Sequence, residues 1–255
     1  MSNFLTEMKA KVLERVHTIP VQKKLTPNTL DFCQIFSTHS AIIAEIKFAS
    51  PSRGNIYPRT LDHVAIAASY LKQGASALSV LTEPHYFKGH INYLSDIRAA
   101  FPTAHLLLKD FVLSEQQLMQ ALAYGANAVL LIVAFLDPIL LRQLYDSALS
   151  MGLTPMIEVH DEQELALAQT LNPKIIGINN RNLNTLKIDL ETSRTLIKQV
   201  SHAYMICESG LQTAAQLHEM TQLGFHGFLI GSHLMATDDP GEALAKLRGD
   251  DNHAR

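Results

Sequence analysis

The stretch AIIAEIKFASPSRG, residues 41–54, begins as an apolar run and ends in a loop rich in proline, serine and glycine. This pattern is typical of a buried parallel strand that leads into a functional loop. Glu45 and Lys47 carry opposite charges inside the apolar run, and because alternate residues of a strand share a face, both side chains point the same way. The pair is either a structural ion pair in the core or a pair retained for chemistry, and this stretch alone favours neither interpretation.

Short strand-like runs and helical stretches alternate along the rest of the chain. We expect strands at 41–47, 76–82, 105–109, 126–133, 154–159, 174–179, 203–208 and 226–231. We expect helices at 60–73, 90–100, 114–124, 137–151, 161–171, 190–200, 213–223 and 240–248. Eight strands that each precede a helix, in about 210 residues, predict an α/β protein with the (β/α)8 TIM barrel fold. A doubly wound open sheet is the alternative, but no GxGxxG motif follows the first strand.

The first 40 residues precede this alternating pattern. Residues 3–18 predict an amphipathic helix with one apolar stripe, and a segment rich in turn residues follows as far as about residue 40. No linker or change in composition marks a second domain. We therefore expect one (β/α)8-barrel domain over residues 1–255, in which residues 1–40 form an N-terminal helical extension.

Composition and charge argue against several classes of function. The net charge is -3, and lysine and arginine are scattered rather than clustered, so no nucleic-acid partner is expected. No apolar run approaches the roughly 20 residues of a membrane span, and the N-terminus has no apolar signal-peptide core, so no membrane partner is expected. Cys33 and Cys207 are too few and too far apart for a disulfide framework or a zinc site, which favours a reduced, cytoplasmic location. The histidines form no HxH or HExxH motif, so no metal is expected.

Polar residues gather where the predicted strands end, and the carboxyl ends of the strands hold the active site in this fold. Charged or amide residues come from five strand ends: Glu45, Lys47, Lys109, Glu158, Asn179, Arg181 and Glu208. The loops after the last two strands add small and hydroxyl-bearing residues: Ser209, Gly210, Gly231 and Ser232. The opposite ends of the same strands mostly lack such groups. A catalytic mouth therefore explains the pattern better than structural ion pairs do.

The residue types at these strand ends indicate acid–base chemistry on a phosphorylated substrate. Lysines and glutamates in a narrow, partly dry cavity hold each other's protonation states and transfer protons near neutral pH. Glycines let a backbone approach an anion, and the loops after the seventh and eighth strands of this fold frequently bind phosphate. Ser50 and Arg53 of the SPSRG loop are further candidates for polar contacts with the substrate.

Eight motifs resemble, in the same order, those of the indole-3-glycerol phosphate synthase family of tryptophan biosynthesis. Between residues 41 and 245 they are AEIKFASPSRG, SVLTEPHYFKG, LLKDF, AVLLI, IEVH, IGINNRNL, ESG and FLIGSHLM. The resemblance implies a lyase that closes the indole ring of 1-(2-carboxyphenylamino)-1-deoxyribulose 5-phosphate, with loss of carbon dioxide and water and without a metal or organic cofactor. It implies a small phosphorylated molecule as the partner. Whether the chain is a monomer or associates with other tryptophan-pathway enzymes stays open.

The resemblance also implies roles for individual residues. Lys109 matches the general acid, and Glu158 matches the general base. Lys47 matches a second active-site lysine, and Glu45 its partner carboxylate. The remaining matched positions are the catalytic residues Asn179 and Glu208 and the substrate-binding residues Ser50, Arg181, Ser209, Gly210, Gly231 and Ser232. A related sugar-phosphate isomerase would not be expected to combine EIK…SPS with KDF, and a catalytically idle barrel would have lost Lys109 or Glu158.

Apolar residues and one histidine near these motifs complete the expectations. Phe87 and Phe111, in the loops after the second and third strands, are candidates for an apolar wall around the anthranilate ring. Leu130 is interpreted as barrel core, and His160 as an ordinary loop histidine. Burial raises the pKa of a glutamate and nearby lysines lower it, so the sequence leaves the direction for Glu158 open.

Overall fold

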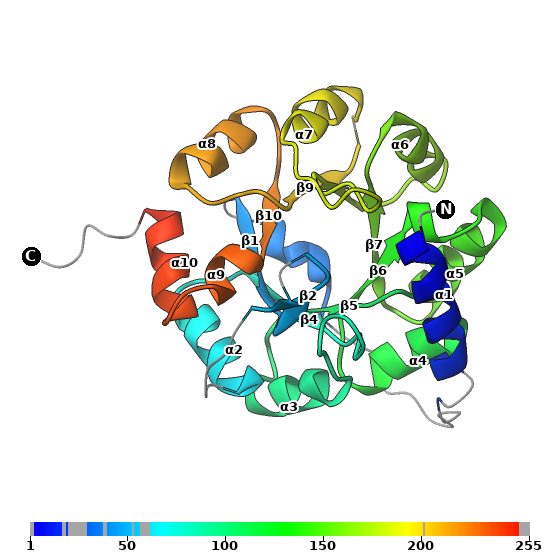
Figure 1. Cartoon of the computed structure of the whole chain (residues 1–255), viewed down its shortest axis with the longest axis horizontal. Helices are drawn as coiled ribbons and strands as arrows, with labels where there is room; N and C mark the ends of the chain where they lie inside the picture. The colour runs from blue at the N-terminus through cyan, green and yellow to red at the C-terminus, as the bar shows by residue number, and fades with distance from the viewer. Residues whose placement is uncertain are drawn as a thin grey trace, which may run out of the picture.

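The computed structural model describes residues 3–16, 19, 30–37, 40–52, 54–56, 62–200 and 202–249. Several expectations lie outside these residues: the end of the predicted N-terminal helix, most of the turn-rich segment after it, the start of the helix predicted at 60–73, and Arg53. Within the described ranges the chain forms a ring of parallel strands with helices around it (Figure 1).

In the described part of the chain, eight parallel strands close into a barrel in which the first strand pairs with the last. They are β1 (Ala41–Ile46), β4 (Ala77–Leu81), β5 (Leu106–Lys109), β6 (Ala128–Ile132), β7 (Thr154–Val159), β8 (Ile175–Asn179), β9 (Tyr204–Glu208) and β10 (Gly227–Ile230). Their order around the barrel, β1-β10-β9-β8-β7-β6-β5-β4, follows the chain. Each lies within two residues of a predicted strand at both ends, so the predicted (β/α)8 fold is confirmed.

Helices cover the outside of the barrel (Figure 1). They are α2 (His63–Lys72), α3 (Asn92–Ala100), α4 (Glu115–Ala123), α5 (Pro138–Ser150), α6 (Glu162–Gln169), α7 (Glu191–Leu196), α8 (Ala214–Gln222) and α10 (Pro240–Arg248). Several begin at a side chain that accepts a free backbone N–H, as Asp137 does from Leu140 before α5. None of the helices in the described ranges combines the length and the apolar character needed to cross a membrane.

Short elements connect the regular ones, and the sequence did not predict them. They are the antiparallel strands β2 (Ala49–Ser50) and β3 (Gly54–Asn55), the helix α9 (Ser232–Met235), and the 3-10 turns η1 (Phe32–Phe36), η2 (Val133–Phe135) and η3 (Ile197–Gln199). The turn η3 replaces the end of the helix predicted at 190–200. Elements of two to five residues are too short to show a hydrophobic period, so tertiary contacts define them.

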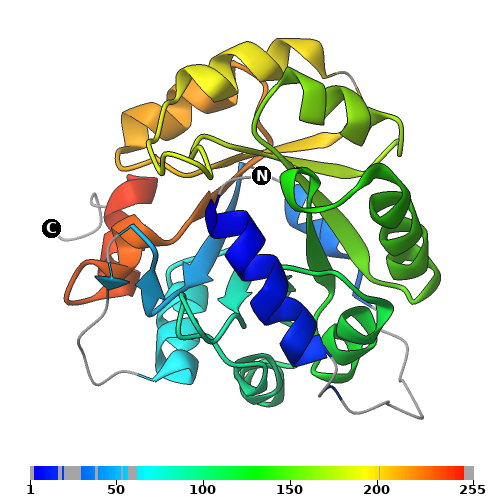
Figure 2. The ribbon, with the colours of Figure 1, turned by 45° about the vertical axis from the view of Figure 1, so that its right-hand side comes forward.

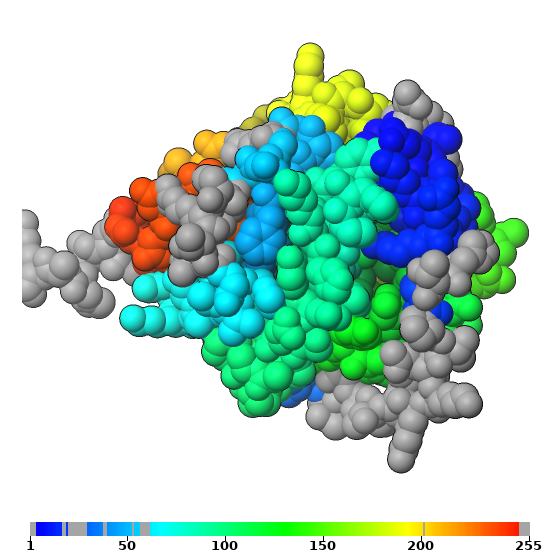
Figure 3. All heavy atoms as spheres, turned by 60° about the horizontal axis from the view of Figure 1, so that its bottom comes forward, coloured from blue at the N-terminus to red at the C-terminus, as the bar shows by residue number. Residues whose placement is uncertain are grey.

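The N-terminal helix α1 (Asn3–Val16) lies over the loops that follow β4 and β5. Figure 2 shows it, in dark blue, crossing the face of the barrel, and in Figure 3 its atoms lie against those of the cyan-green loops. Met8 and Val12 of its apolar stripe are buried. Arg15 Nη2 lies 2.6 Å from Asp110 Oδ1, in the residue that follows Lys109. The extension therefore reaches the mouth of the barrel rather than its outer wall.

The interior of the barrel changes from apolar to charged along its axis. Ile43 and Met156 are fully buried at its middle level. Two residues further along the same strands, Glu45 and Glu158 take the inward-facing positions, because alternate residues of a strand share a face. The change occurs toward the carboxyl ends, where this fold carries its chemistry.

Candidate active site

A cavity of about 360 Å³ opens at the carboxyl ends of the strands. The predicted site residues that line it are Glu45, Lys47, Phe87, Lys109, Phe111, Glu158, Asn179, Arg181, Glu208, Ser209, Gly210, Gly231 and Ser232. Ser50 is the exception, because it lies in β2, where it pairs with Gly54 of β3 and its hydroxyl lies 3.4 Å from that of Ser52. The structure thus brings together residues from seven of the eight predicted strand ends and their loops, and leaves Ser50 out of the lining.

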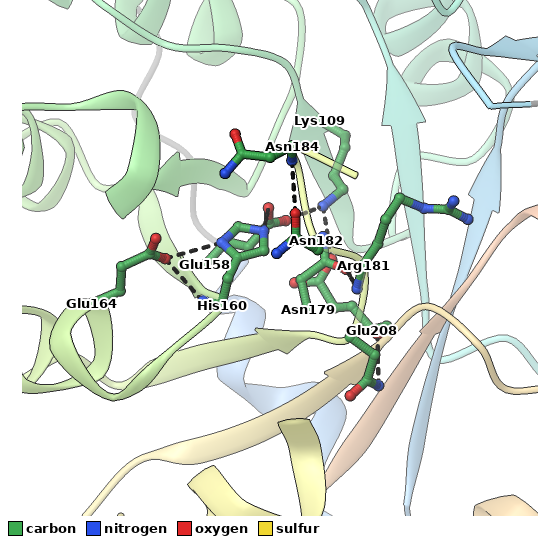
Figure 4. A network of polar contacts seen from close by, with 10 residues as sticks. Lys109, Glu158, His160, Glu164, Asn179, Arg181, Asn182, Asn184 and Glu208 are labelled. Atoms are coloured by element: carbon green, nitrogen blue, oxygen red, sulfur yellow. Dashed lines mark hydrogen bonds and ion pairs between the residues drawn. The ribbon is translucent and has the colours of Figure 1, made fainter. Parts of the chain in front are cut away.

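The centre of the site is the ammonium group of Lys109. It donates hydrogen bonds to Glu158 Oε2 and to Glu208 Oε2, each at 2.8 Å (Figure 4). All three side chains are withdrawn from solvent, with exposures of 12%, 2% and 2%. Burial disfavours the charge on Lys109, but the carboxylates of Glu158, Glu208 and Glu45 outweigh it and raise the pKa of Lys109 above its ordinary value.

The second lysine forms a separate pair beside the first. Lys47 Nζ donates to Glu45 Oε1 at 2.5 Å, which is the same-face contact expected for residues two apart in extended backbone at the end of β1. Glu45 is buried, whereas the Lys47 side chain keeps an exposure of 13% toward the cavity. Two lysines and three glutamates therefore share one cavity.

Two inward-facing glycines make room for the deepest carboxylates. A Cβ atom on Gly177 of β8 would lie 2.2 Å from Glu208 Oε1, and a Cβ on Gly231 would lie 2.3 Å from Glu45 Oε1. Both distances are too short for atoms that are not bonded to each other, so each carboxylate occupies the volume that a side chain at the glycine would otherwise fill. Gly177 was not predicted from the sequence as a site residue, although a glycine inside a strand signals a close approach of this kind.

The carboxyl groups on either side of Lys109 titrate differently. Burial raises the pKa of Glu158, but Lys109 and His160 lower it by more, so its pKa lies well below the ordinary value and the group is ionised. Burial also raises the pKa of Glu208, and although Lys109 lowers it, the neighbouring Glu158 and Glu45 carboxylates help to bring it to about 7. Glu208 Oε1 has no hydrogen-bond partner among the described residues, which agrees with a carboxyl group that readily binds a proton.

His160 is not the ordinary loop histidine that the sequence suggested. Its Nε2 lies 3.3 Å from Glu158 Oε1, and its Nδ1 lies 3.0 Å from Glu164 Oε2 (Figure 4). The side chain is 9% exposed. Burial lowers its pKa, but Glu158 and Glu164 raise it to about 10. His160 follows Glu158 by two residues, the spacing that places side chains on one face, and this was the available signal.

The loop after β8 is held by its own polar groups. Asn179 Oδ1 accepts the backbone N–H of Arg181 at 3.0 Å, and Arg181 Nη1 donates to Leu186 O at 3.0 Å and to Ser52 Oγ at 3.3 Å. An isolated antiparallel bridge joins Arg181 to Ile188. The guanidinium of Arg181 therefore lies over the mouth of the cavity, between the loops after β8 and β1.

Backbone amides and hydroxyls gather at the ends of β9 and β10. Ser209 and Gly210 both have left-handed backbone conformations, with φ of 65° and 90°. Asn180, which is buried, holds this turn by donating to Glu208 O at 2.9 Å and to Ser209 O at 3.0 Å. Successive turn residues of this kind form concave anion-binding surfaces. Further cavity-lining residues at this end were missed by the sequence analysis: Gln212, His233 and Thr237.

The other end of the cavity is apolar. Phe87 and Phe111 line it, as the sequence predicted, with ring centroids 6.3 Å apart. Leu130 was interpreted as core and is buried, but it lines the cavity too. Glu83 fixes the loop that carries Phe87, because its carboxylate accepts the backbone N–H groups of three residues, at 2.8, 2.7 and 3.1 Å. The cavity thus runs from an aromatic wall, past the charged centre, to the polar turns.

The residues that the structure describes contain no group of three or more His, Cys, Asp or Glu side chains arranged to hold a metal ion. The chemistry available at the centre is proton transfer by buried lysines and glutamates. The fold and this site together define a (β/α)8-barrel enzyme of the acid–base class.

Comparison with known proteins gives the family. The family model described as indole-3-glycerol phosphate synthase matches residues 2–247, and the chain belongs to this family. An indole-3-glycerol phosphate synthase of Lactiplantibacillus plantarum is 40% identical over 244 residues, which are 94% of this chain and 92% of that protein. One of Salinibacter ruber is 41% identical over 211 residues, 82% of this chain and 78% of the relative. One of Campylobacter jejuni is 43% identical over 207 residues, 81% of this chain and 80% of the relative.

Solved structures resemble the fold at much lower identity. The 3-hexulose-6-phosphate synthase of Salmonella typhimurium matches with a TM-score of 0.67 and 12% identity, covering 82% of this chain and 97% of that one. A KGPDC structure from Streptococcus mutans matches with a TM-score of 0.63 and 10% identity, covering 83% and 97%. These similarities concern the barrel fold alone.

Proposed function

We propose that Lys109 and Glu158 act as general acid and general base in the indole-3-glycerol phosphate synthase reaction of this chain. The enzyme converts 1-(2-carboxyphenylamino)-1-deoxyribulose 5-phosphate to indole-3-glycerol phosphate, carbon dioxide and water. The single observation that supports these roles is the placement of the Lys109 ammonium, 2.8 Å from two buried carboxylates. A cation held there is aimed at the cavity and can exchange a proton with either neighbour.

The reaction requires protons at defined points. The ring carbon that bears the carboxyl group attacks the ketone carbon, and the ketone oxygen must gain a proton as the new bond forms. Loss of carbon dioxide restores the aromatic ring. The resulting hydroxyl must then gain a second proton to leave as water, and a carbon next to the nitrogen must lose a proton to complete the indole. Lys109 and Lys47 are placed to give protons, and Glu158 to take one.

The ends of the cavity fit the two ends of the substrate. The aromatic wall of Phe87 and Phe111 suits the anthranilate ring, and the turns at Ser209–Gly210 and Gly231–Ser232 suit the phosphate. Arg181 and Asn179 lie between them, where the sugar hydroxyls would pass. Glu45 and Glu208 hold the two lysines in place. We leave Ser50 out of the binding set, because it lies outside the cavity lining.

We also propose that the chain acts in the cytoplasm. Cys33 and Cys207 are both free thiols, and burial raises the pKa of Cys207 to about 11, so this thiol is unreactive. Location of the expressed protein by fractionation of cells checks this point.

The roles of Lys109 and Glu158 are tested by the growth of indole fluorescence from the anilino-ribulose phosphate. Lys109→Met and Glu158→Gln should each lower kcat by about 10²–10⁴-fold, the usual contribution of a positioned acid or base, with KM changed little. Lys198→Met, an exposed change outside the cavity, is the matched control and should keep full activity. Turnover of Lys109→Met within threefold of the unmodified protein would remove Lys109 from the acid role.

A further inference from the structure

His160 lies between two carboxylates. Its Nδ1 is 3.0 Å from Glu164 Oε2, and the same oxygen accepts the backbone N–H of His160 at 2.9 Å. Its Nε2 is 3.3 Å from Glu158 Oε1, while the other oxygen of that carboxylate binds Lys109 (Figure 4). Glu158 is thus contacted by one cationic lysine and one imidazole, each on its own oxygen.

The surroundings of the ring fix its protonation. An ionised carboxylate only accepts hydrogen bonds, so a ring nitrogen that faces one must carry a proton to avoid repulsion between lone pairs. Both nitrogens of His160 face carboxylates, and in a neutral imidazole one of these nitrogens would carry no proton. The doubly protonated ring is the form that fits. The burial of the side chain, at 9% exposure, strengthens its attraction to both carboxylates.

Local sequence explains why Glu164 is in place to hold the ring. Asp161 caps α6 by accepting the backbone N–H of Glu164 at 2.8 Å. Glu164 is the third residue of the helix, the position from which an acidic side chain reaches back to the N–H groups before the first turn. Here it reaches the backbone and the ring of His160.

We propose that His160 is a positioning residue of the active site, which, held by Glu164, binds the free oxygen of the Glu158 carboxylate and keeps that carboxylate ionised and fixed in orientation. This inference rests on the proposed role of Glu158 as general base. The Nε2–H does not align on Oε1 as a hydrogen bond among the described residues, so the contact acts through charge and packing. His160 itself is not among the residues that line the cavity, so its role is exerted through Glu158.

The other charges around Glu158 do not make His160 redundant. Lys109 is shared with Glu208, and it also feels Glu45, which is paired with Lys47. Three carboxylates therefore compete for the charge of one ammonium. Among the described residues, His160 forms its ion pairs with Glu158 and Glu164, and of these two carboxylates Glu158 is the one that lines the cavity. Loss of this cation should raise the pKa of Glu158. Lys109 should still donate to Oε2 of that carboxylate.

Nuclear magnetic resonance of the ring tests the contact without using catalysis. The ring nitrogens of His160 should show the doubly protonated form at pH 8 in the unmodified protein, where an ordinary histidine is neutral. Glu164→Gln and Glu158→Gln should each lower the titration midpoint of His160 by about one pH unit or more. Glu162→Gln, the same change two residues away on α6, should leave it in place. A neutral ring at pH 8 in the unmodified protein overturns the proposal.

Kinetics test the consequence for the base. In His160→Gln and in Glu164→Gln, the acidic limb of the kcat profile should move up by about one pH unit, with KM and the alkaline kcat within about threefold of the unmodified protein. His218→Gln, an exposed histidine on α8, is the matched control. A purely structural role would lower stability and leave the limb in place. The proposal is overturned if Glu158→Gln abolishes the acidic limb of the pH profile while His160→Gln and Glu164→Gln both leave that limb at its original pH.

The two proposals fail in different ways. If Glu158→Gln retains the acidic limb, Glu158 is not the base, and the functional part of this inference falls with it. The ring titration of His160 in Glu158→Gln still decides whether the contact between the two side chains exists. If Glu158 behaves as the general base but the ring of His160 is neutral at pH 8, this inference is refuted and the proposed function stands.

Discussion

Gly177 shows how a residue without a side chain can define a charged site. It faces the barrel interior beside Glu208, whose Oε1 occupies the place of the missing Cβ. Gly177→Ala would bring the new methyl within 2.2 Å of that oxygen and 2.7 Å of Met156 Cε. The Glu208 carboxylate must then shift, which disturbs its hydrogen bond with Lys109.

We predict that Gly177→Ala lowers kcat by at least about tenfold and destabilises the fold by about 1–3 kcal/mol through overpacking. Activity assays and urea unfolding measure both effects. Because the methyl acts through Glu208, its effect on kcat should be much smaller in a Glu208→Gln background. Additive effects in the double variant would contradict this explanation.

Glu208 should make stability depend on pH near neutrality. The pKa of Glu208 is about 7 in the folded protein, against an ordinary value of 4.5, so between these values the folded state holds the proton and an unfolded chain does not. The stabilisation from this proton is complete below pH 4.5 and is lost as pH rises through 7.

The free energy of unfolding of the unmodified protein, relative to Glu208→Gln, should therefore fall by about 1–3 kcal/mol between pH 5 and pH 8. Urea unfolding of both proteins across this range measures the difference. A difference that stays constant with pH would assign the proton near pH 7 to another group.

The positions of the site residues could be predicted from the sequence, but their electrostatic states could not. Lys109 and Glu158 were found because strand ends of this fold converge on one mouth. Whether burial or a cation dominates the pKa of Glu158 depends on a 2.8 Å contact with Lys109 and on the ring of His160. Both belong to tertiary geometry. Ser50 was misplaced for the related reason that the short pairing of β2 with β3 leaves no trace in the sequence pattern.

At the scale of elements, Arg98 joins α3 to the turns on the amino-terminal side of the barrel. Its guanidinium donates to four backbone carbonyls, those of Gly125, Phe101, Pro102 and Ala104, and to Asn127 Oδ1. Asn127 in turn accepts the backbone N–H of Leu106 at the start of β5. A lysine would keep the charge, but its single ammonium group could not replace the several N–H donors of the planar guanidinium.

We predict that Arg98→Lys destabilises the fold by about 2–4 kcal/mol, because several partly buried carbonyls lose their partners together, while kcat of the folded protein stays unchanged. Thermal or urea unfolding, together with the activity assay, tests this. Arg142→Lys is the matched control, since Arg142 is exposed and donates to one carbonyl, that of Thr170. Equal losses in both variants would show that the additional hydrogen bonds of Arg98 contribute nothing to stability.

Long elements were predicted and short ones were not. The strands carry apolar runs bounded by turn residues, and the helices carry a period of 3.6 residues, so both are visible locally. The four residues of α9 and the two-residue strands have no period, and they form because β10 and the loop after β1 place them. The position of α1 across the mouth depends on Arg15 and Asp110, which are far apart in the sequence.

At the scale of the molecule, the barrel closes only when β10 pairs with β1. We predict that ribosome-arrested chains with residues up to 224 outside the exit tunnel are readily digested by protease, whereas chains with residues up to 249 outside resist it. The reason is that the first strand has no partner on one side until β10 emerges. Protection that arises before β10 leaves the tunnel would contradict this order of folding.

The unfinished chain has an open edge that the finished barrel lacks. At roughly 5–20 residues per second, β1 waits roughly 10–40 s for its last neighbour, and an unpaired apolar strand invites pairing with another chain. Charged side chains on such an edge discourage that pairing. Glu45 and Lys47 lie at and just beyond the end of β1. We therefore expect the two charges that face the cavity of the finished barrel also to discourage strand pairing at the carboxyl end of β1 while the ribosome completes the chain.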